Sequence, residues 1–231
     1  MGRGRLASVS VSKSRVKKVA TVTKPSTRTN DPERTMAEIL KVAMHEFADK
    51  GLSGARIDEI ASATRTSKRM IYYYFDSKEG LYLRVLEEAY RRMRQIESEL
   101  HLDDLAPIDA LRRLVEFTFD HHSKNEDYIR LVMSENMHYA SYLAQSKSIQ
   151  QLNVPAISAI QRLYERGVES GVFRPGLDSV DIHASISALT FFNVSNRYTF
   201  GHIFKRNLQS TAFQTARRTA VVDMVLRYVQ K

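Results

Sequence analysis

The sequence predicts an all-α protein, with a short three-helix unit near the N-terminus and a larger helical bundle after it. Apolar residues recur at intervals of three and four through most of the chain, and no convincing pair of alternating segments indicates strands. The composition is that of an ordinary globular protein, with 43% hydrophobic and 26% charged residues among 231. We therefore expect one or two folded domains with an apolar core.

The net charge of +9 is concentrated at the N-terminus. Residues 1–30 contain eight Lys and Arg but no Asp or Glu, which leaves +1 for the rest of the chain. Such a segment, with Ser, Thr and Gly between the charges, is typical of a disordered arm that binds nucleic acid. A merely solvating extension is the alternative. Its Arg and Ser content is also that of a transit peptide, but the helices described below favour DNA.

Composition also predicts the compartment and argues against a membrane-spanning segment. The chain has no cysteine, which excludes disulfides and thiolate zinc sites and fits a reducing compartment, so we expect a cytoplasmic location. The longest charge-poor stretch, residues 184–196, is too short and too polar to span a bilayer. No membrane partner is expected.

The first predicted helix starts at Asp31 and Pro32, because Asp caps helices and Pro is favoured in their first turn. A stripe of apolar residues at helical spacing runs from Met36 to Phe47. Gly51 is expected to end this helix, since glycine readily adopts the left-handed conformation of a helix terminus.

Two more short helices follow. The second is expected to begin at Ile57, and the third begins near Thr66 and Ser67 and stops at Asp76. Three helices in about 45 residues, with a tight turn between the second and the third, form the helix-turn-helix pattern. The last helix of this pattern is the one that enters the major groove of DNA.

A long helix is predicted from Ser77, which caps it, to Leu100, with an apolar seam of more than five turns. It is long enough to connect two subdomains. Further helical segments are expected at 108–119, 128–132, 149–168 with an interruption at Pro155, 179–200, and 213–228. The expected domains are a basic arm (1–30), a helix-turn-helix domain (31–77) and a helical bundle (78–231).

The most specific signal is residues 60–81, which read IASATRTSKRMIYYYFDSKEGL. This stretch resembles the DNA-binding signature of the tetracycline-repressor family, Ile-Ala-x-x-Ala-Gly-Val-Ser, three residues, then Leu-Tyr-x-x-Phe-x-Ser-Lys-Glu-x-Leu. The resemblance covers about residues 32–90, and the later helices agree with the family in class and length. Arg65, Thr64 and Arg56 stand where the family has Gly, Ala and Thr or Ser, which leaves the turn geometry and the operator open.

The third helix supplies the candidate DNA contacts. Long cationic side chains in its first turn can reach guanine edges or phosphates, and Arg69 is the first candidate for reading a base. The resemblance implies phosphate contacts from Tyr72 and Tyr73 and from Lys78 at the start of the long helix. Tyr74 serves equally well as a core residue. The predicted DNA-binding residues are Arg56, Thr66, Ser67, Lys68, Arg69, Tyr72, Tyr73 and Lys78.

An enzyme or metal carrier is the rival hypothesis. Glu135 and His138 form one Glu-x-x-His element, but a di-iron bundle needs two copies. His45 and Glu46 do not start a zinc motif, because Asp49 occupies the position of the second histidine. We therefore predict no catalytic residue, no metal and no cofactor.

Polar groups among aromatic residues after residue 103 predict a pocket for a small organic effector between helices. Each such side chain has a structural alternative, as core or as a partner of buried backbone. With no acidic cluster facing it, Arg162 or Arg197 could pair with a carboxylate of the ligand, or remain a surface charge. The predicted ligand-binding residues are Tyr128, Met133, Asn136, His138, Tyr142, Arg162, Phe192, Asn193, Asn196 and Arg197.

A homodimer is expected, because one recognition helix contacts too little DNA for tight specific binding. The last two helices would form the interface through small residues (Ala184, Ser185, Ser187, Ala188) and an apolar stripe (Phe213, Ala220, Met224, Tyr228). Together with the resemblance, these features predict a ligand-responsive transcriptional regulator, most simply a repressor that an effector releases from a double-stranded DNA operator.

Overall fold

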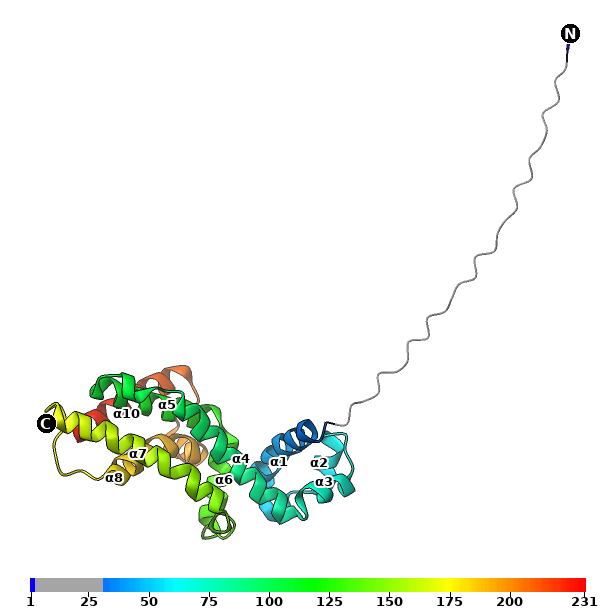
Figure 1. Ribbon diagram of the computed structural model, residues 1–231, viewed down its shortest axis with the longest axis horizontal. Helices are drawn as coiled ribbons and strands as arrows, with labels where there is room; N and C mark the ends of the chain where they lie inside the picture. Colours follow the sequence, from blue (N-terminus) through cyan, green and yellow to red (C-terminus); the bar gives the residue numbers. More distant parts are fainter. Residues whose placement is uncertain (3–30) are drawn as a thin grey trace. The chain divides into compact units, whose positions relative to one another are not determined.

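The computed structural model describes Met1, Gly2 and residues 31–231 (Figure 1). The predicted basic arm therefore lies outside the described residues except for its first two. Residues Pro32–Lys231 form one compact unit. Its helices are α1 (Pro32–Gly54), α2 (Ile57–Ala63), α3 (Lys68–Phe75), α4 (Lys78–Ser98), α5 (Pro107–Lys124), α6 (Glu126–Met137), α7 (Lys147–Glu169), α8 (Ser179–Ser195), α9 (Arg197–Phe204) and α10 (Thr211–Val229), with 3-10 turns η1 (Leu102–Asp104) and η2 (Leu143–Gln145).

The all-α prediction is confirmed for residues 31–231, where a single bridge between Phe173 and Gln230 is the one β-type pairing. Gly51 has φ 66°, so the regular part of α1 ends at the predicted residue before a last turn to Gly54. Ser67 and Ser77 cap α3 and α4 as expected, since their side chains accept hydrogen bonds from backbone N–H groups one turn later. Local sequence thus determines these boundaries.

Two predicted boundaries are wrong. Pro155 lies inside α7 and does not interrupt it. A proline removes one intrahelical hydrogen bond, and at this exposed position water can bond the carbonyl that loses its partner. The helix predicted over residues 179–200 is two helices, α8 and α9, which meet at Asn196. The Asn196 side chain donates a hydrogen bond to the Oγ of Ser195 at 2.8 Å, a local contact that competes with helical backbone geometry.

Two apolar cores lie along this unit, and α4 contributes to the first and leads into the second. The first core joins α1, α2, α3 and the first half of α4, with Leu131 of α6 and Ile149 of α7 closing it. The second core joins α5, α7, α8 and α10 and includes Leu100 and Leu102, just beyond the end of α4. In Figure 1, α4 runs from the α1–α3 group toward α5 and α7. A displacement of α4 would therefore affect both groups of helices.

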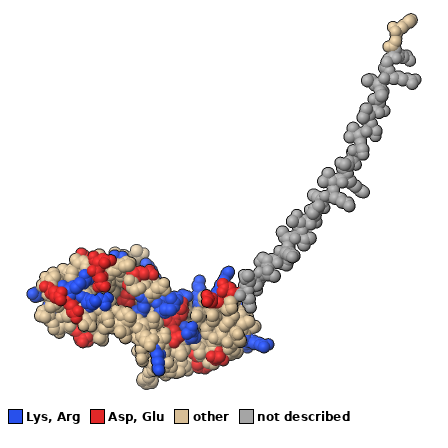
Figure 2. All heavy atoms as spheres, in the orientation of Figure 1, with Lys and Arg blue, Asp and Glu red and all other residues tan. Residues whose placement is uncertain are grey.

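None of the helices in the described part of the chain combines the length and apolarity needed to cross a membrane. On the face of residues 31–231 seen in Figure 2, Lys and Arg are mixed with Asp and Glu and do not form one continuous basic patch. This mixture agrees with a net charge near zero for this part of the chain.

Candidate DNA-binding surface and effector cavities

The turn between α2 and α3 is closed by backbone hydrogen bonds around a left-handed residue. The N–H of Thr66 donates to the carbonyl of Ala61 at 3.0 Å, and the N–H of Arg65 donates to that of Ser62 at 3.2 Å. Arg65 has φ 51°, a conformation that glycine adopts without strain and other residues adopt at a cost. The family pattern has Gly here, and this chain places Arg in the left-handed conformation that glycine favours.

Helix α3 buries one face and exposes the other. Ile71 and Phe75 are fully buried in the first core, while Tyr73 is 77% exposed and Tyr72 is 43% exposed. Tyr74 is half-buried against that core and makes an edge-to-face contact with Phe75. Tyr74 is therefore structural, and the two preceding tyrosines are free to face a partner.

The cations of this surface differ in how they are held. Lys68 pairs with Asp58 of α2 at 2.5 Å, whereas Arg69 is exposed and makes no ion pair or side-chain hydrogen bond with the residues that the structure describes. Arg56 is also exposed, and its backbone N–H donates to a Glu46 oxygen at 3.1 Å. The Arg69 guanidinium is thus available to a partner without breaking any contact with the described residues.

Three of the residues predicted to contact DNA also have structural roles within the fold. The Nζ of Lys78 donates to the carbonyl of Ser53 at 3.2 Å and so ties the first turn of α4 to the α1–α2 turn. Ser67 uses its hydroxyl as the α3 cap, and Thr66 is half-buried in the turn. Lys78 keeps two further donors for a phosphate, since a lysine ammonium carries three.

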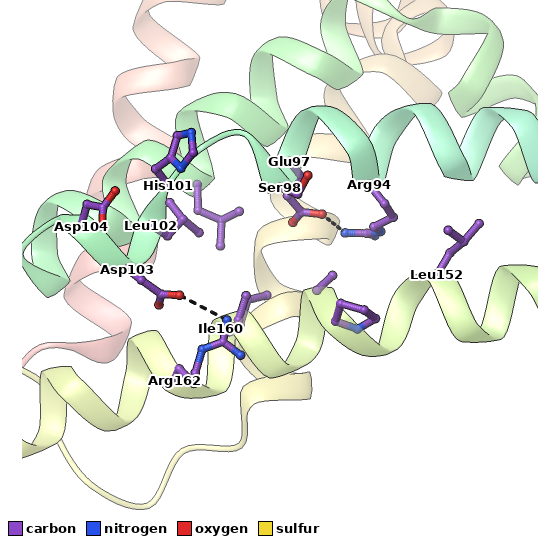
Figure 3. A pocket seen from close by; sticks show the side chains of 14 residues that line it. Arg94, Glu97, Ser98, His101, Leu102, Asp103, Asp104, Leu152, Ile160 and Arg162 are labelled. Carbon is purple, nitrogen blue, oxygen red and sulfur yellow. Dashed lines mark hydrogen bonds and ion pairs between the residues drawn. The ribbon is translucent and has the colours of Figure 1, made fainter.

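A cleft of about 410 Å³, here called the outer cleft, opens between the end of α4, η1 and α7 (Figure 3). Arg162 lines it and pairs with Asp103 at 3.3 Å. Arg166 holds η1 in place by donating to the carbonyls of Leu102, Asp103 and Leu105 at 2.8–3.0 Å. The outer cleft therefore has one wall fixed by arginine-to-backbone contacts.

A second space of about 210 Å³, the inner cavity, lies between α4, α5, α6, α7 and α8. Its lining is aromatic and polar, and its two histidines are held neutral. Burial, with the nearby cationic groups, lowers the pKa of His122 to about 3, and burial and the charge of Arg94 lower the pKa of His183. The lining residues are Tyr90, Met93, Arg94, Glu97, Thr118, His122, Tyr128, Val132, Asn153, His183, Ser187 and Phe191.

Arg94 and Glu97 line both spaces, so this ion pair forms the wall between them. Their side chains are 11% and 10% exposed, and the Nε of Arg94 also donates to Asn153 of α7 at 3.0 Å. In Figure 3 the pair projects from α4 toward α7. A molecule that enters either space meets the C-terminal turns of α4.

A third cavity, of about 510 Å³, lies where the end of α1 meets α6, α8 and the start of α9. Met133 and His138 line it, together with Arg130 and Tyr198. It is lined by residues of α1, which the other two spaces do not reach, but no buried cation lines it.

The ten predicted ligand residues do not converge on one cavity. Tyr128 lines the inner cavity, Arg162 the outer cleft, and Met133 and His138 the third cavity. The other six line none of these three spaces. They are the exposed Asn136 and Phe192, Tyr142 packed against the first core, Asn193 bonded to Arg217, and Asn196 and Arg197 at the α8–α9 junction.

The expectation that no acid faces Arg162 or Arg197 is wrong. Arg162 pairs with Asp103, and Arg197, whose side chain is 9% exposed, pairs with Glu126. These acids lie 59 and 71 residues away in the sequence, so chain folding brings them together. The nearly buried Arg94 lines two of these spaces and is absent from the predicted ligand residues. Its i, i+3 spacing from Glu97 is that of an ordinary surface pair, so the sequence gives no sign of its burial.

Glu135 and His138 do not converge on a metal site. A Glu135 oxygen accepts a hydrogen bond from the N–H of Leu143 at 2.9 Å, and the Nδ1 of His138 lies 2.7 Å from the carbonyl of Ser134. Within residues 31–231 no group of three or more His, Asp or Glu side chains is placed to hold a metal ion.

Comparison with known proteins assigns both parts of the chain to one family. Residues 39–85 match the family model described as bacterial regulatory proteins, tetR family, and residues 107–225 match the tetracyclin repressor-like C-terminal domain. The HTH-type transcriptional repressor NicS of Pseudomonas putida is 31% identical over 208 residues, which cover 90% of this chain and 98% of that protein. The HTH-type transcriptional repressor SCO4008 of Streptomyces coelicolor is 32% identical over 139 residues, 60% of this chain and 69% of that protein.

A solved structure supports the fold. The putative transcriptional regulator SCO4942 of Streptomyces coelicolor superposes with a TM-score of 0.61 at 29% identity, covering 84% of this chain and 98% of that one. The chain therefore belongs to the tetracycline-repressor (TetR) family and is a DNA-binding regulator of transcription rather than an enzyme.

Proposed function

We propose that this regulator is a homodimeric repressor that leaves a double-stranded DNA operator when a small organic effector occupies the spaces at the C-terminal end of α4. One observation carries the proposal. The first turn of α4 is bonded to the α1–α2 turn through Lys78 and Ser53, and its last turns carry Arg94 and Glu97 into the outer cleft and the inner cavity.

The mechanism follows from the rigidity of α4. A helix transmits displacement along its axis, so a ligand that shifts Arg94 against α7 also shifts the end that holds α3. Five apolar residues of α4, from Leu81 to Ala89, are buried in the core of the DNA-binding helices. The effector must bind the two arrangements unequally, and a coupling of about 1–3 kcal/mol changes operator affinity roughly 5- to 150-fold.

Residues 31–77 are proposed as the DNA-binding domain, with Arg69 as base reader and with phosphate contacts from the exposed tyrosines and from Arg56, Lys68 and Lys78. Arg69 carries this assignment because its charge is exposed and unpaired among the described residues. Residues 78–231 are proposed as the effector-binding and dimerisation domain. Residues 1–30 are proposed to add non-specific attraction to DNA.

The proposed dimer interface is the outer surface of α8 and α10, which contact one another in the chain. Ala184 and Ala188 on α8 and Ala220 and Met224 on α10 are exposed, and small residues permit close approach of helices. Ser187 of the predicted set lines the inner cavity instead. Two such helices from each copy would form a four-helix contact.

The repressor assignment is supported by the names of NicS and SCO4008, both called transcriptional repressors. The test is fluorescence anisotropy with labelled upstream DNA of the chain's own gene, with and without compounds from a small-molecule library. Salt-dependent, sequence-selective binding that a saturating compound weakens at least 5-fold is the expected result. Removal of residues 1–30 should flatten the salt dependence. Absence of selective binding would contradict the proposal.

A further inference from the structure

Resting on the proposed effector site, we propose that Arg94 is the anion receptor of the inner cavity, and that its ligand is a planar, single-ring aromatic compound carrying one anionic group. In this arrangement the ligand's carboxylate or comparable oxyanion replaces Glu97 as the partner of Arg94. The ring lies among the aromatic side chains of α5, α6 and α8.

The volume of the inner cavity sets the ligand's size. An apolar cavity of about 150 Å³ is enough to hold benzene. The inner cavity has about 210 Å³, which accommodates one ring with a small substituent, whereas a steroid or a long acyl chain needs more space. The outer cleft of about 410 Å³ lies on the other side of the Arg94–Glu97 wall and provides a route of entry.

The shape of the lining favours a flat molecule. Tyr128 and His122 lie with their rings at an interplanar angle of 26°, and Phe191 meets His122 edge-on at 90°. Tyr90 contacts Tyr128 edge-to-face at 5.6 Å between ring centroids. Aromatic rings pack against one another in offset or edge-to-face geometry, so a further ring is better matched here than an aliphatic chain.

The charge of the cavity favours an anion. Arg94 and Glu97 face it from α4, His122 from α5 beside His121, Tyr128 from α6 and His183 from α8, while α7 contributes the uncharged Asn153. Burial is the main cause of the lowered pKa of His121, His122 and His183, and the Arg94 charge lowers each of these pKa values further. With these histidines neutral, Arg94 and Glu97 are the charged side chains among the lining residues, so an anion that takes the place of Glu97 pairs with the one cation there.

The donor geometry of Arg94 completes the argument. Its Nε is used by Asn153 and its Nη1 by Glu97, while Nη2 makes no hydrogen bond with any described residue. An oxyanion that displaced Glu97 would accept from Nη1 and Nη2 together, in the bidentate geometry that arginine forms with carboxylates. Because the pair is the wall between the two spaces, the same exchange opens the inner cavity and moves a side chain of α4.

The experiment compares three probes of similar size, benzoate, benzamide and benzylamine, by isothermal titration calorimetry at pH 7.5. In the wild type we expect benzoate to bind about 10- to 100-fold more tightly than either of the other two, as charge-assisted hydrogen bonds of a buried arginine require. Arg94→Met should abolish that preference, and Arg94→Lys should retain part of it. Glu97→Gln should strengthen benzoate binding, because the competing carboxylate is gone.

The matched control is Arg91→Met, at an exposed arginine on the same helix that pairs with Glu88, and it should bind benzoate as the wild type does. Circular dichroism and operator binding show that each variant is folded. Failure of benzoate to bind up to millimolar concentration, equal binding of benzamide, or a preference that survives in Arg94→Met would overturn the inference. If benzoate binds through Arg94 without changing operator affinity, the receptor assignment stands and the proposed coupling fails. If an uncharged compound alone releases the operator, the coupling stands and the anion class is wrong.

Discussion

The Nε atom of Arg130 on α6 donates a hydrogen bond to the carbonyl oxygen of Ala48 near the end of α1, over 2.8 Å. The same guanidinium lies 3.5 Å from the carbonyl of Asp49 and 3.7 Å from its carboxylate. Carbonyl groups in the last turn of a helix lack intrahelical partners, and a cation there also interacts favourably with the helix dipole. Arg130 thus links the proposed effector domain to the first DNA-binding helix, independently of α4.

Replacing Arg130 with methionine keeps the apolar stem and removes the cap of α1. We expect the free energy of unfolding to fall by about 1–2 kcal/mol, since bonds from a charged donor are lost and carbonyls are left without a partner. Urea denaturation followed by circular dichroism measures this. Arg84→Met is the control, because Arg84 is 63% exposed and pairs within α4, so its loss should cost less than about 0.5 kcal/mol. Equal stability of the two variants would show that the α1–α6 contact is unimportant.

Replacing Arg65 with glycine should stabilise the protein. The residue has φ 51°, and release of left-handed strain gains about 1–2 kcal/mol, part of which glycine's freedom in the unfolded chain offsets. A net gain near 1 kcal/mol is expected in the same denaturation assay. Arg69→Gly, in the regular part of α3, should instead lose about 1 kcal/mol. A loss in both variants would mean that the Arg65 side chain supports the turn.

These turn and cap residues show what the sequence predicts well. The boundaries at Gly51, Ser67 and Ser77 depend on backbone conformation and on hydrogen bonds within one turn, so local sequence determines them. The prediction failed at Pro155, which α7 accommodates at an exposed position, and at Asn196, where α8 gives way to α9. Neither is visible in helical periodicity.

The candidate DNA surface could be assembled from the sequence because seven of its eight residues lie between Thr66 and Lys78, within one short motif. The proposed effector site could not be assembled in this way. Arg94, His122 and His183 come from three helices, and their common cavity depends on how α4, α5 and α8 pack. Burial is also not visible in the sequence. Arg94 and Glu97 have the spacing of a solvated surface pair, yet in the fold their side chains are nearly inaccessible.

Arg69→Ala and Tyr72→Phe should affect DNA binding differently. Loss of the base-reading guanidinium should cost about 1–3 kcal/mol on the preferred operator and relax discrimination at one position. Loss of the Tyr72 hydroxyl should weaken all sequences about equally, as expected for a phosphate contact. Anisotropy titrations against single-base operator variants distinguish the two patterns. An unchanged sequence preference in Arg69→Ala would assign base reading to another residue.

The buried His122 should make the protein less stable in acid. Its folded-state pKa of about 3 lies below the unfolded value near 6.5, so between these values the unfolded chain binds the extra proton. Stability is therefore highest above pH 6.5 and is lost as the pH falls toward 3, by about 1–2 kcal/mol between pH 7 and pH 5. His122→Gln should flatten this decline in urea denaturation at the two pH values. His202→Gln, at an exposed position of α9, should decline as the wild type does.

A charge on the proposed dimer surface should separate the copies and weaken operator binding. Ala188 of α8 and Ala220 of α10 are both exposed in the chain, and arginine at either position would place a long cation where two helices approach closely. We expect Ala188→Arg and Ala220→Arg to sediment as monomers at micromolar concentration, where the wild type sediments as a dimer. Their operator affinity should fall at least 100-fold, because each recognition helix then binds alone. Ala144→Arg, at an exposed position of η2 away from α8 and α10, controls for the added charge. A wild type that is monomeric under these conditions, or dimers that persist in both variants, would place the interface elsewhere.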